Sequence, residues 1–177
     1  MIKKILIAFA AILAGLLVLV AMQPDSYTVT RKAVIDAPPE RVFSLVNDFH
    51  EWDKWSPWAK IDPNMKATYD GAPAGTGAIY SWTGNDEVGE GRMTILDSQS
   101  NSQIKINLEF LKPFESKAIT DFSFKPGGGG TEVAWVMTGD SSFMSKAVSL
   151  AMGGMDKMIG PDFEKGLAQM KTAAEAN

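Results

Sequence analysis

The segment Gln103–Phe110, QIKINLEF, alternates polar and apolar side chains over its whole length. The residues on its apolar face are Ile104, Ile106, Leu108 and Phe110. A strand with this pattern has one face against a core and one face in water, which is typical of antiparallel sheets. The segment therefore predicts that the chain is built around an antiparallel sheet with one apolar face.

Other segments repeat this period of two, with turn residues between them about every ten positions. We expect strands at residues 65–70, 77–83, 89–97, 103–110, 117–124 and 131–139, and a further strand at 27–35 that is rich in Val, Thr and Tyr. Short turns between successive strands indicate a meander. The sequence predicts a seven-stranded antiparallel sheet.

Two regions have helical spacing instead. After the prolines of DAPPERVFSLVNDF, Pro39 fits the first helical position and the apolar residues from Val42 to Phe49 form one face. The tail, residues 143–173, carries apolar residues every three or four positions. Because Gly153-Gly154 and Gly160-Pro161 interrupt this tail, we expect two helical pieces or one kinked helix.

The N-terminus holds 18 uncharged residues, Ile5–Met22, after Lys3 and Lys4. At 1.5 Å per residue such a helix is about 27 Å long, close to the hydrocarbon thickness of a bilayer. A cleaved signal peptide is the alternative, but the apolar run is long for one and no clean cleavage site precedes Gln23. We predict an uncleaved membrane anchor at 1–23 and a domain at 24–177. The lysines place that domain on the extracytoplasmic side of the inner membrane, with a single pass.

The charge of the domain excludes some partners. Of the 17 basic residues, Lys3 and Lys4 precede the span, which leaves 15 basic against 21 acidic residues and a net charge of −6. A domain of this sign, without a basic stripe, is not expected to bind nucleic acid. The chain has no cysteine, so it forms no disulfide and has no thiol nucleophile. Nothing in the sequence names a protein partner.

The segment Asn47–Lys66 contains Trp52, Trp55 and Trp58, three of the five tryptophans of the chain. In a solvated loop these three indoles would expose a large apolar area to water, so we expect the segment to lie against a core, a ligand or a membrane. The spacing of three places the indoles on one face of a helical turn. They could close the end of the core, line the mouth of a cavity, or do both.

The chain is poor in residues that carry out chemistry. His50 is the only histidine, and its acidic neighbours favour a solvated position or a contact with the helix end over a catalytic role. We find no nucleotide-binding or nucleophile motif and no set of metal ligands. Asp86, Glu87 and Glu90 are interpreted as a solvated turn. We predict no catalytic residue, no metal site and no cofactor.

Several segments resemble the SRPBCC superfamily (START-like, helix-grip), and more narrowly its membrane-anchored bacterial members called polyketide cyclase/dehydrase-like. The segments are VIDAPPERVFSLVNDFHEWDKWSPW (34–58), YSWTGNDEVGEGRMTI (80–95), LEFLKPFESKA (108–118), GGTEVAWVMTG (129–139) and MIGPDFEKGL (158–167). The resemblance covers about residues 27–171 and implies an α+β helix-grip fold, in which the sheet wraps around a long C-terminal helix. It does not imply one function, since the superfamily includes lipid carriers, receptors and cyclases.

A sheet wrapped around one helix often leaves space between them for an apolar ligand. We expect a membrane-anchored module that binds a hydrophobic small molecule or lipid there. The alternatives are a cyclase or dehydratase acting on a polyketide-like substrate and a protein-interaction module with a filled cavity. The expected ligand-binding residues are Trp55, Trp58, Trp82, Met93, Phe110, Trp135, Met137, Met155 and Ile159. The direction of Trp82 stays open, because the pattern of strand 77–83 allows either face to point inward.

Overall fold

The computed structural model describes residues 1–176, and Asn177, the last residue of the predicted domain, lies outside them. Seven strands form one antiparallel sheet in the order β1-β7-β6-β5-β4-β3-β2. The strands are β1 Ser26–Ile35, β2 Lys66–Gly71, β3 Ala78–Thr83, β4 Glu90–Gln99, β5 Gln103–Lys112, β6 Ser116–Gly127 and β7 Gly130–Asp140. From β2 to β7 each strand pairs with the next one in the chain, and β1 pairs with β7. The predicted seven-stranded meander is confirmed.

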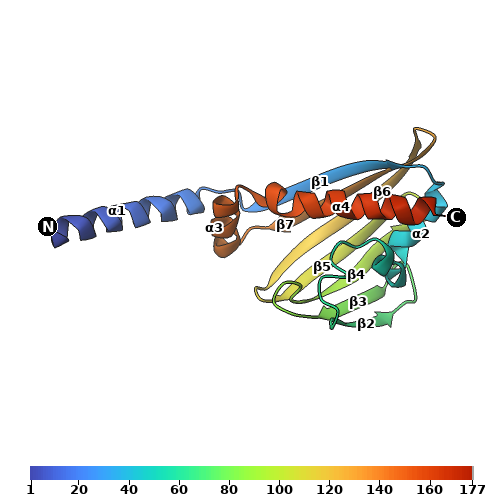
Figure 1. Cartoon of the computed structure of the whole chain (residues 1–177), viewed down its shortest axis with the longest axis horizontal. Coiled ribbons are helices and arrows are strands. Elements are labelled where there is room, and N and C mark those ends of the chain that lie inside the picture. Colours follow the sequence, from blue (N-terminus) through green and yellow to red (C-terminus); the bar gives the residue numbers. More distant parts are fainter. Residues whose placement is uncertain (177) are drawn as a thin grey trace.

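The long C-terminal helix α4, Met155–Glu175, lies along the inner face of the curved sheet and packs most closely on β1 (Figure 1). Its buried side chains are Phe163, Leu167, Met170 and Ala174. The apolar face of β5 meets this layer, since Ile104 and Ile106 are fully buried and Leu108 nearly so. A sheet that grips one helix is the α+β helix-grip fold that the sequence predicts.

The Trp-rich segment closes one end of the core. Helix α2, Pro39–Asn47, starts at a proline, and the short 3-10 helix η1, Phe49–Lys54, follows it after Asp48. The indole nitrogen of Trp52 donates to the Val46 carbonyl at 3.0 Å, and that of Trp55 donates to the Leu45 carbonyl at 2.7 Å. These carbonyls belong to the last turn of α2, which has no partners within its own helix. The two tryptophans therefore cap α2 as well as filling the core.

The tail is broken once, not twice. Helix α3, Phe143–Met152, ends at Gly153 and Gly154, whose φ values of 83° and 112° suit glycine. The predicted interruption at Gly160-Pro161 is wrong, since both residues lie inside α4. Gly160 instead makes room for Arg31 of β1, since a Cβ at this position would lie 2.0 Å from the guanidinium. The guanidinium binds the carboxylates of Asp156 and Glu164, on either side of the Gly160-Pro161 step, at 2.7 Å each.

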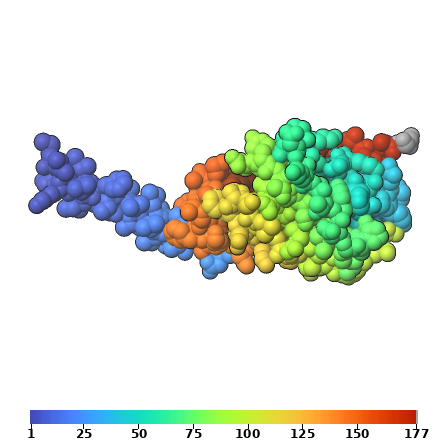
Figure 2. Space-filling view, turned by 90° about the horizontal axis from the view of Figure 1, so that it is seen from below, coloured from blue at the N-terminus to red at the C-terminus, as the bar shows by residue number. Residues whose placement is uncertain are grey.

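The N-terminal helix α1, Ile2–Ala21, extends away from the domain (Figures 1 and 2). Its length and mean hydropathy of 2.7 are those of a helix that could cross a membrane, and a signal sequence would have the same properties. Val20 is its one buried residue, and α3 is the element that it contacts most. Helix α1 therefore contributes almost nothing to the core of the domain.

Candidate ligand-binding cavity

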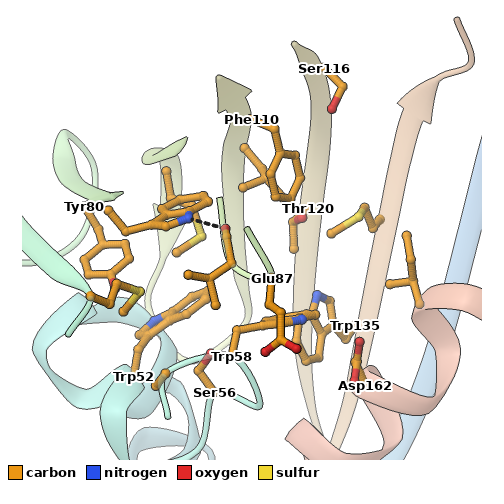
Figure 3. Close-up of a pocket in the computed structure, with 18 of the residues that line it drawn as sticks. Trp52, Ser56, Trp58, Tyr80, Glu87, Phe110, Ser116, Thr120, Trp135 and Asp162 are labelled. Carbon is orange, nitrogen blue, oxygen red and sulfur yellow. Dashed lines mark hydrogen bonds between the residues drawn. The ribbon is translucent and has the colours of Figure 1, made fainter. Parts of the chain in front are cut away.

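A cavity of about 300 Å³ lies between the sheet, the Trp-rich segment and the first turns of α4. Its walls come from β1, β3 to β7, η1 and the loop after it, the β3–β4 turn and α4 (Figure 3). Most of the side chains that line it are apolar: Trp52, Trp58, Met65, Tyr80, Trp82, Val88, Met93, Leu108, Phe110, Trp135, Met137, Met155 and Ile159. An apolar cavity of about 150 Å³ already accommodates a benzene molecule, so this space is large enough for a small apolar ligand.

The structure brings eight of the nine predicted site residues to this cavity: Trp58, Trp82, Met93, Phe110, Trp135, Met137, Met155 and Ile159. Trp55 is not among the lining residues. It is 1% exposed and packs behind the wall, edge to face against Trp135 at 5.6 Å and against Phe122 at 6.0 Å between ring centroids. Capping the Leu45 carbonyl holds its ring in that deeper layer. Trp82 takes the inward direction that the sequence left open.

Two of the aromatic walls lie over glycines of the neighbouring strand. Trp82 of β3 is the cross-strand partner of Gly91, and a Cβ at Gly91 would come within 2.4 Å of the indole. Tyr27 of β1 faces Gly139 in the same manner, with its hydroxyl oxygen 2.7 Å from where a Cβ would be. The missing side chains give each ring the room to lie flat on the sheet. These glycines therefore fix the direction of two cavity walls.

Trp135 of β7 lies at the centre of the aromatic wall in the deep part of the cavity. Its ring stacks on Phe163 of α4 at 3.9 Å between centroids and on Phe122 of β6 at 4.9 Å. Trp58 meets it edge to face at 5.9 Å. A side chain held on several sides by aromatic rings has one well-defined position, so this wall is preformed.

Two polar atoms of the cavity wall are buried without a hydrogen-bond partner among residues 1–176. They are the hydroxyl oxygen of Thr120 on β6 and the indole nitrogen of Trp135. In contrast, the indole nitrogens of Trp52, Trp55 and Trp82 each donate to a backbone carbonyl. A buried unpaired polar group destabilises a protein, so it points to a missing partner. Both atoms suit an oxygen of a ligand, which can accept from the indole and pair with the hydroxyl.

The carboxylates of the cavity lie toward its edge. Asp53 and Glu87 are exposed and Asp162 is half-buried, and Figure 3 shows the carboxylates of Glu87 and Asp162 in front of the aromatic wall. Burial, with smaller effects of Tyr69 and Asp53, raises the pKa of the Tyr80 phenol to about 12. Burial likewise raises the pKa of Tyr27. At neutral pH both phenols are therefore neutral hydrogen-bonding groups, and neither serves as a base.

His50 lies outside the cavity, where it stacks on Tyr69 and makes a hydrogen bond of 2.8 Å to Asp48. Glu90 of the predicted solvated turn begins β4 and pairs with Lys112, its cross-strand partner on the adjacent strand β5. Within residues 1–176 no three His, Asp or Glu side chains are placed to hold a metal ion. The histidine and this part of the turn thus have ordinary structural contacts.

Sequence reasoning missed the polar residues of the cavity. Thr120 carried a usable signal, because the period of two placed a hydroxyl on the buried face of strand 117–124. The sequence holds no comparable signal that Asp53, Glu87 and Asp162 would reach the cavity. Asp53 lies in η1, Glu87 in the β3–β4 turn and Asp162 among several acidic residues on α4, so only the fold brings them to one cavity.

The chain belongs to the family described as polyketide cyclase/dehydrase and lipid transport, whose model matches residues 26–175. This match spans the whole sheet, the Trp-rich segment and both tail helices. No curated protein matches the sequence.

Solved structures with the same fold share little sequence with this chain. Protein CV1439 from Chromobacterium violaceum is 17% identical, with a TM-score of 0.61 over 88% of this chain and 100% of that one. The di-domain ARO/CYC BexL from the BE-7585A biosynthetic pathway is 15% identical, with a TM-score of 0.59 over 90% of this chain and 53% of that one. The di-domain ARO/CYC StfQ from the steffimycin biosynthetic pathway is 11% identical, with a TM-score of 0.60 over 85% and 51%. This chain spans about half the length of each di-domain protein, and the likeness is one of fold.

Proposed function

We propose that this protein is a membrane-anchored binding module that holds a hydrophobic small molecule or lipid between the sheet and α4. The observation that carries this proposal is the cavity of about 300 Å³ with preformed aromatic walls and two buried, unpaired polar atoms. Such a site favours a mainly apolar ligand with one oxygen, because apolar contact supplies affinity and the few polar groups supply orientation. The family's description, which includes lipid transport, agrees with this class of ligand.

The anchor in this proposal is α1. Its Lys3 and Lys4 remain on the cytoplasmic side, and the domain lies on the outer side of the inner membrane. A helix of 20 residues fits one passage through a bilayer. Sequencing the N-terminus of the protein taken from native membranes tests this part: Met1 is expected, and a start near Gln23 would instead identify a cleaved signal.

The binding function is tested by native mass spectrometry of the full chain extracted from membranes in a mild detergent. The expected result is a bound small molecule that is displaced by added 2-acetylnaphthalene, an apolar aromatic ketone. A protein that carries no ligand and takes up neither this ketone nor any membrane lipid would overturn the proposal.

A cyclase or dehydratase acting in the same cavity is the second candidate, and the carboxylates of Glu87 and Asp162 at its edge favour it. A carboxylate beside a bound ketone could take up a proton as a general base. The binding module is the stronger candidate, because these two groups lie toward solvent while the deep part of the cavity is apolar. A poly-β-ketone analogue incubated with wild type and with the Glu87→Gln, Asp162→Asn variant separates the two: loss of water in wild type alone would indicate an enzyme.

A further inference from the structure

Helix α3 has its polarity reversed relative to a helix on the surface of a soluble domain. Its exposed apolar side chains, from 40% to 61% exposed, are Phe143, Met144, Val148, Leu150 and Met152. With 3.6 residues per turn, these and the two alanines share one broad arc. Ser145, Lys146 and Ser149 occupy the other arc, where Lys146 is buried and the two serines are half-buried; on the apolar arc Ala147 alone is half-buried and the other residues are exposed. The polar side of α3 faces the protein, and its apolar side faces outward.

The position of α3 indicates what covers this surface. The helix contacts the domain-side end of α1 and is turned across the line of α1 (Figure 1). Its buried Lys146 forms an ion pair with Asp25, in the short linker that follows α1. If α1 leaves the bilayer at Ala21, α3 lies at the level of the lipid headgroups. Amphipathic helices bind at this level with their apolar face in the lipid.

A second apolar segment lies at the same end of the domain. At the end of β5 Leu111 is 45% exposed, and in the following β5–β6 turn Phe114 is 67% exposed. Figure 2 shows this turn, in yellow, beside the orange α3 at the end of the domain from which α1 projects. The same segments reach the cavity: Ser116 follows the turn, Met155 follows α3, and both line the cavity. One end of the cavity is thus next to the apolar surface.

We propose that α3 and the β5–β6 turn together form a membrane-docking surface, which lies in the lipid interface beside α1 and holds the Ser116–Met155 end of the cavity against the bilayer. This inference rests on the membrane anchor of the proposed function. It adds that the ligand exchanges directly with the membrane, so the bound molecule is an amphiphile of the bilayer. Because the contact is apolar and the domain has a net charge of −6, high salt should not weaken the docking.

The experiment uses the full chain in nanodiscs of phosphatidylethanolamine and phosphatidylglycerol. The chain has no cysteine, so a single introduced cysteine carries one spin label. Labels at Val148→Cys, Met152→Cys and Phe114→Cys probe the proposed surface. Leu13→Cys inside α1 gives the value for lipid, and Lys165→Cys on the exposed side of α4 gives the value for water. Collision rates with oxygen, which concentrates in lipid, and with a water-soluble nickel chelate are measured at each position.

The expected result is a collision ratio at Val148, Met152 and Phe114 shifted from the Lys165 value toward the Leu13 value, in low and in high salt. Labels on α3 as accessible to nickel as Lys165 would overturn the proposal. Protection from both reagents, with dipolar broadening between copies, would overturn it in favour of a dimer. Binding of 2-acetylnaphthalene, measured on the same samples, separates this result from the proposed function: binding with α3 in water refutes docking alone.

Discussion

Replacing Thr120 by valine should stabilise the empty protein and weaken its binding of a ketone. The Thr120 hydroxyl is buried on the cavity wall and has no partner among residues 1–176. Leaving such a group unpaired costs about 1–3 kcal/mol, and a methyl group in its place adds apolar contact. We expect Thr120→Val to raise the free energy of unfolding by about 1 kcal/mol. In a chain of this size that corresponds to a rise in Tm of about 2–4 °C.

Ligand affinity should change in the opposite direction. If the hydroxyl donates to the ketone oxygen, its loss removes about 1 kcal/mol of binding free energy, which weakens binding by roughly five- to tenfold. Calorimetric titration with 2-acetylnaphthalene, at matched detergent concentration, measures the affinity. Thermal unfolding of the same samples without ligand measures the stability.

Thr131→Val is the matched control, because Thr131 is also buried but its hydroxyl donates to the Ala37 carbonyl at 2.7 Å. This variant removes a formed hydrogen bond, so it should destabilise the protein by about 1–3 kcal/mol and leave ketone affinity unchanged. The reasoning is refuted if Thr120→Val destabilises the protein as Thr131→Val does, or if it leaves ketone affinity unchanged.

Three other predictions concern Trp135 of the cavity wall, the N-terminal helix α1 and the effect of pH on stability. Trp135→Ala should lower the free energy of unfolding by about 3–5 kcal/mol, since the ring is stacked in the core, whereas Trp135→Phe should keep most of the stability and weaken ketone binding in calorimetry. A chain lacking residues 1–23 should remain soluble with a cooperative unfolding transition, because α1 buries only Val20; a molten product would show that α1 is part of the fold. Burial raises the pKa of Tyr80 from 10 to about 12, so its contribution to stability is complete below pH 10 and is lost as pH rises toward 12. Denaturant unfolding across this range should show a smaller loss in Tyr80→Phe than in wild type, and an equal loss would exclude Tyr80 as the cause.

The sheet could be predicted because its signal is local. A strand with one wet face alternates at every position, so QIKINLEF and its neighbours gave the strand positions and the inward faces of Leu108 and Trp135. The same alternation along the other strands predicted most of the apolar residues that line the cavity. Met155 and Ile159 followed from the helical spacing of the tail.

The features that the sequence did not predict depend on contacts between distant segments. Trp55 shares the spacing of Trp58, yet it packs behind the cavity wall against Phe122 of β6 and Trp135 of β7. The helix continues through Gly160-Pro161, where Gly160 leaves room for Arg31, about 130 residues earlier, which binds carboxylates on both sides of this step. The carboxylates of the cavity edge meet there only through the fold. None of these features can be predicted from the residues adjacent to it in the sequence.

The most direct test of the binding site is photoaffinity labelling of the full chain in membranes by an apolar ketone that carries a diazirine. Mass spectrometry of the digested protein locates the labelled residues. The account predicts labels on cavity residues of β4, β5 and the start of α4, namely Met93, Phe110 and Met155, and their loss in excess 2-acetylnaphthalene. Labels confined to the outer surfaces of α1 and α3, or cavity labels that the ketone does not displace, would contradict a ligand site between the sheet and α4.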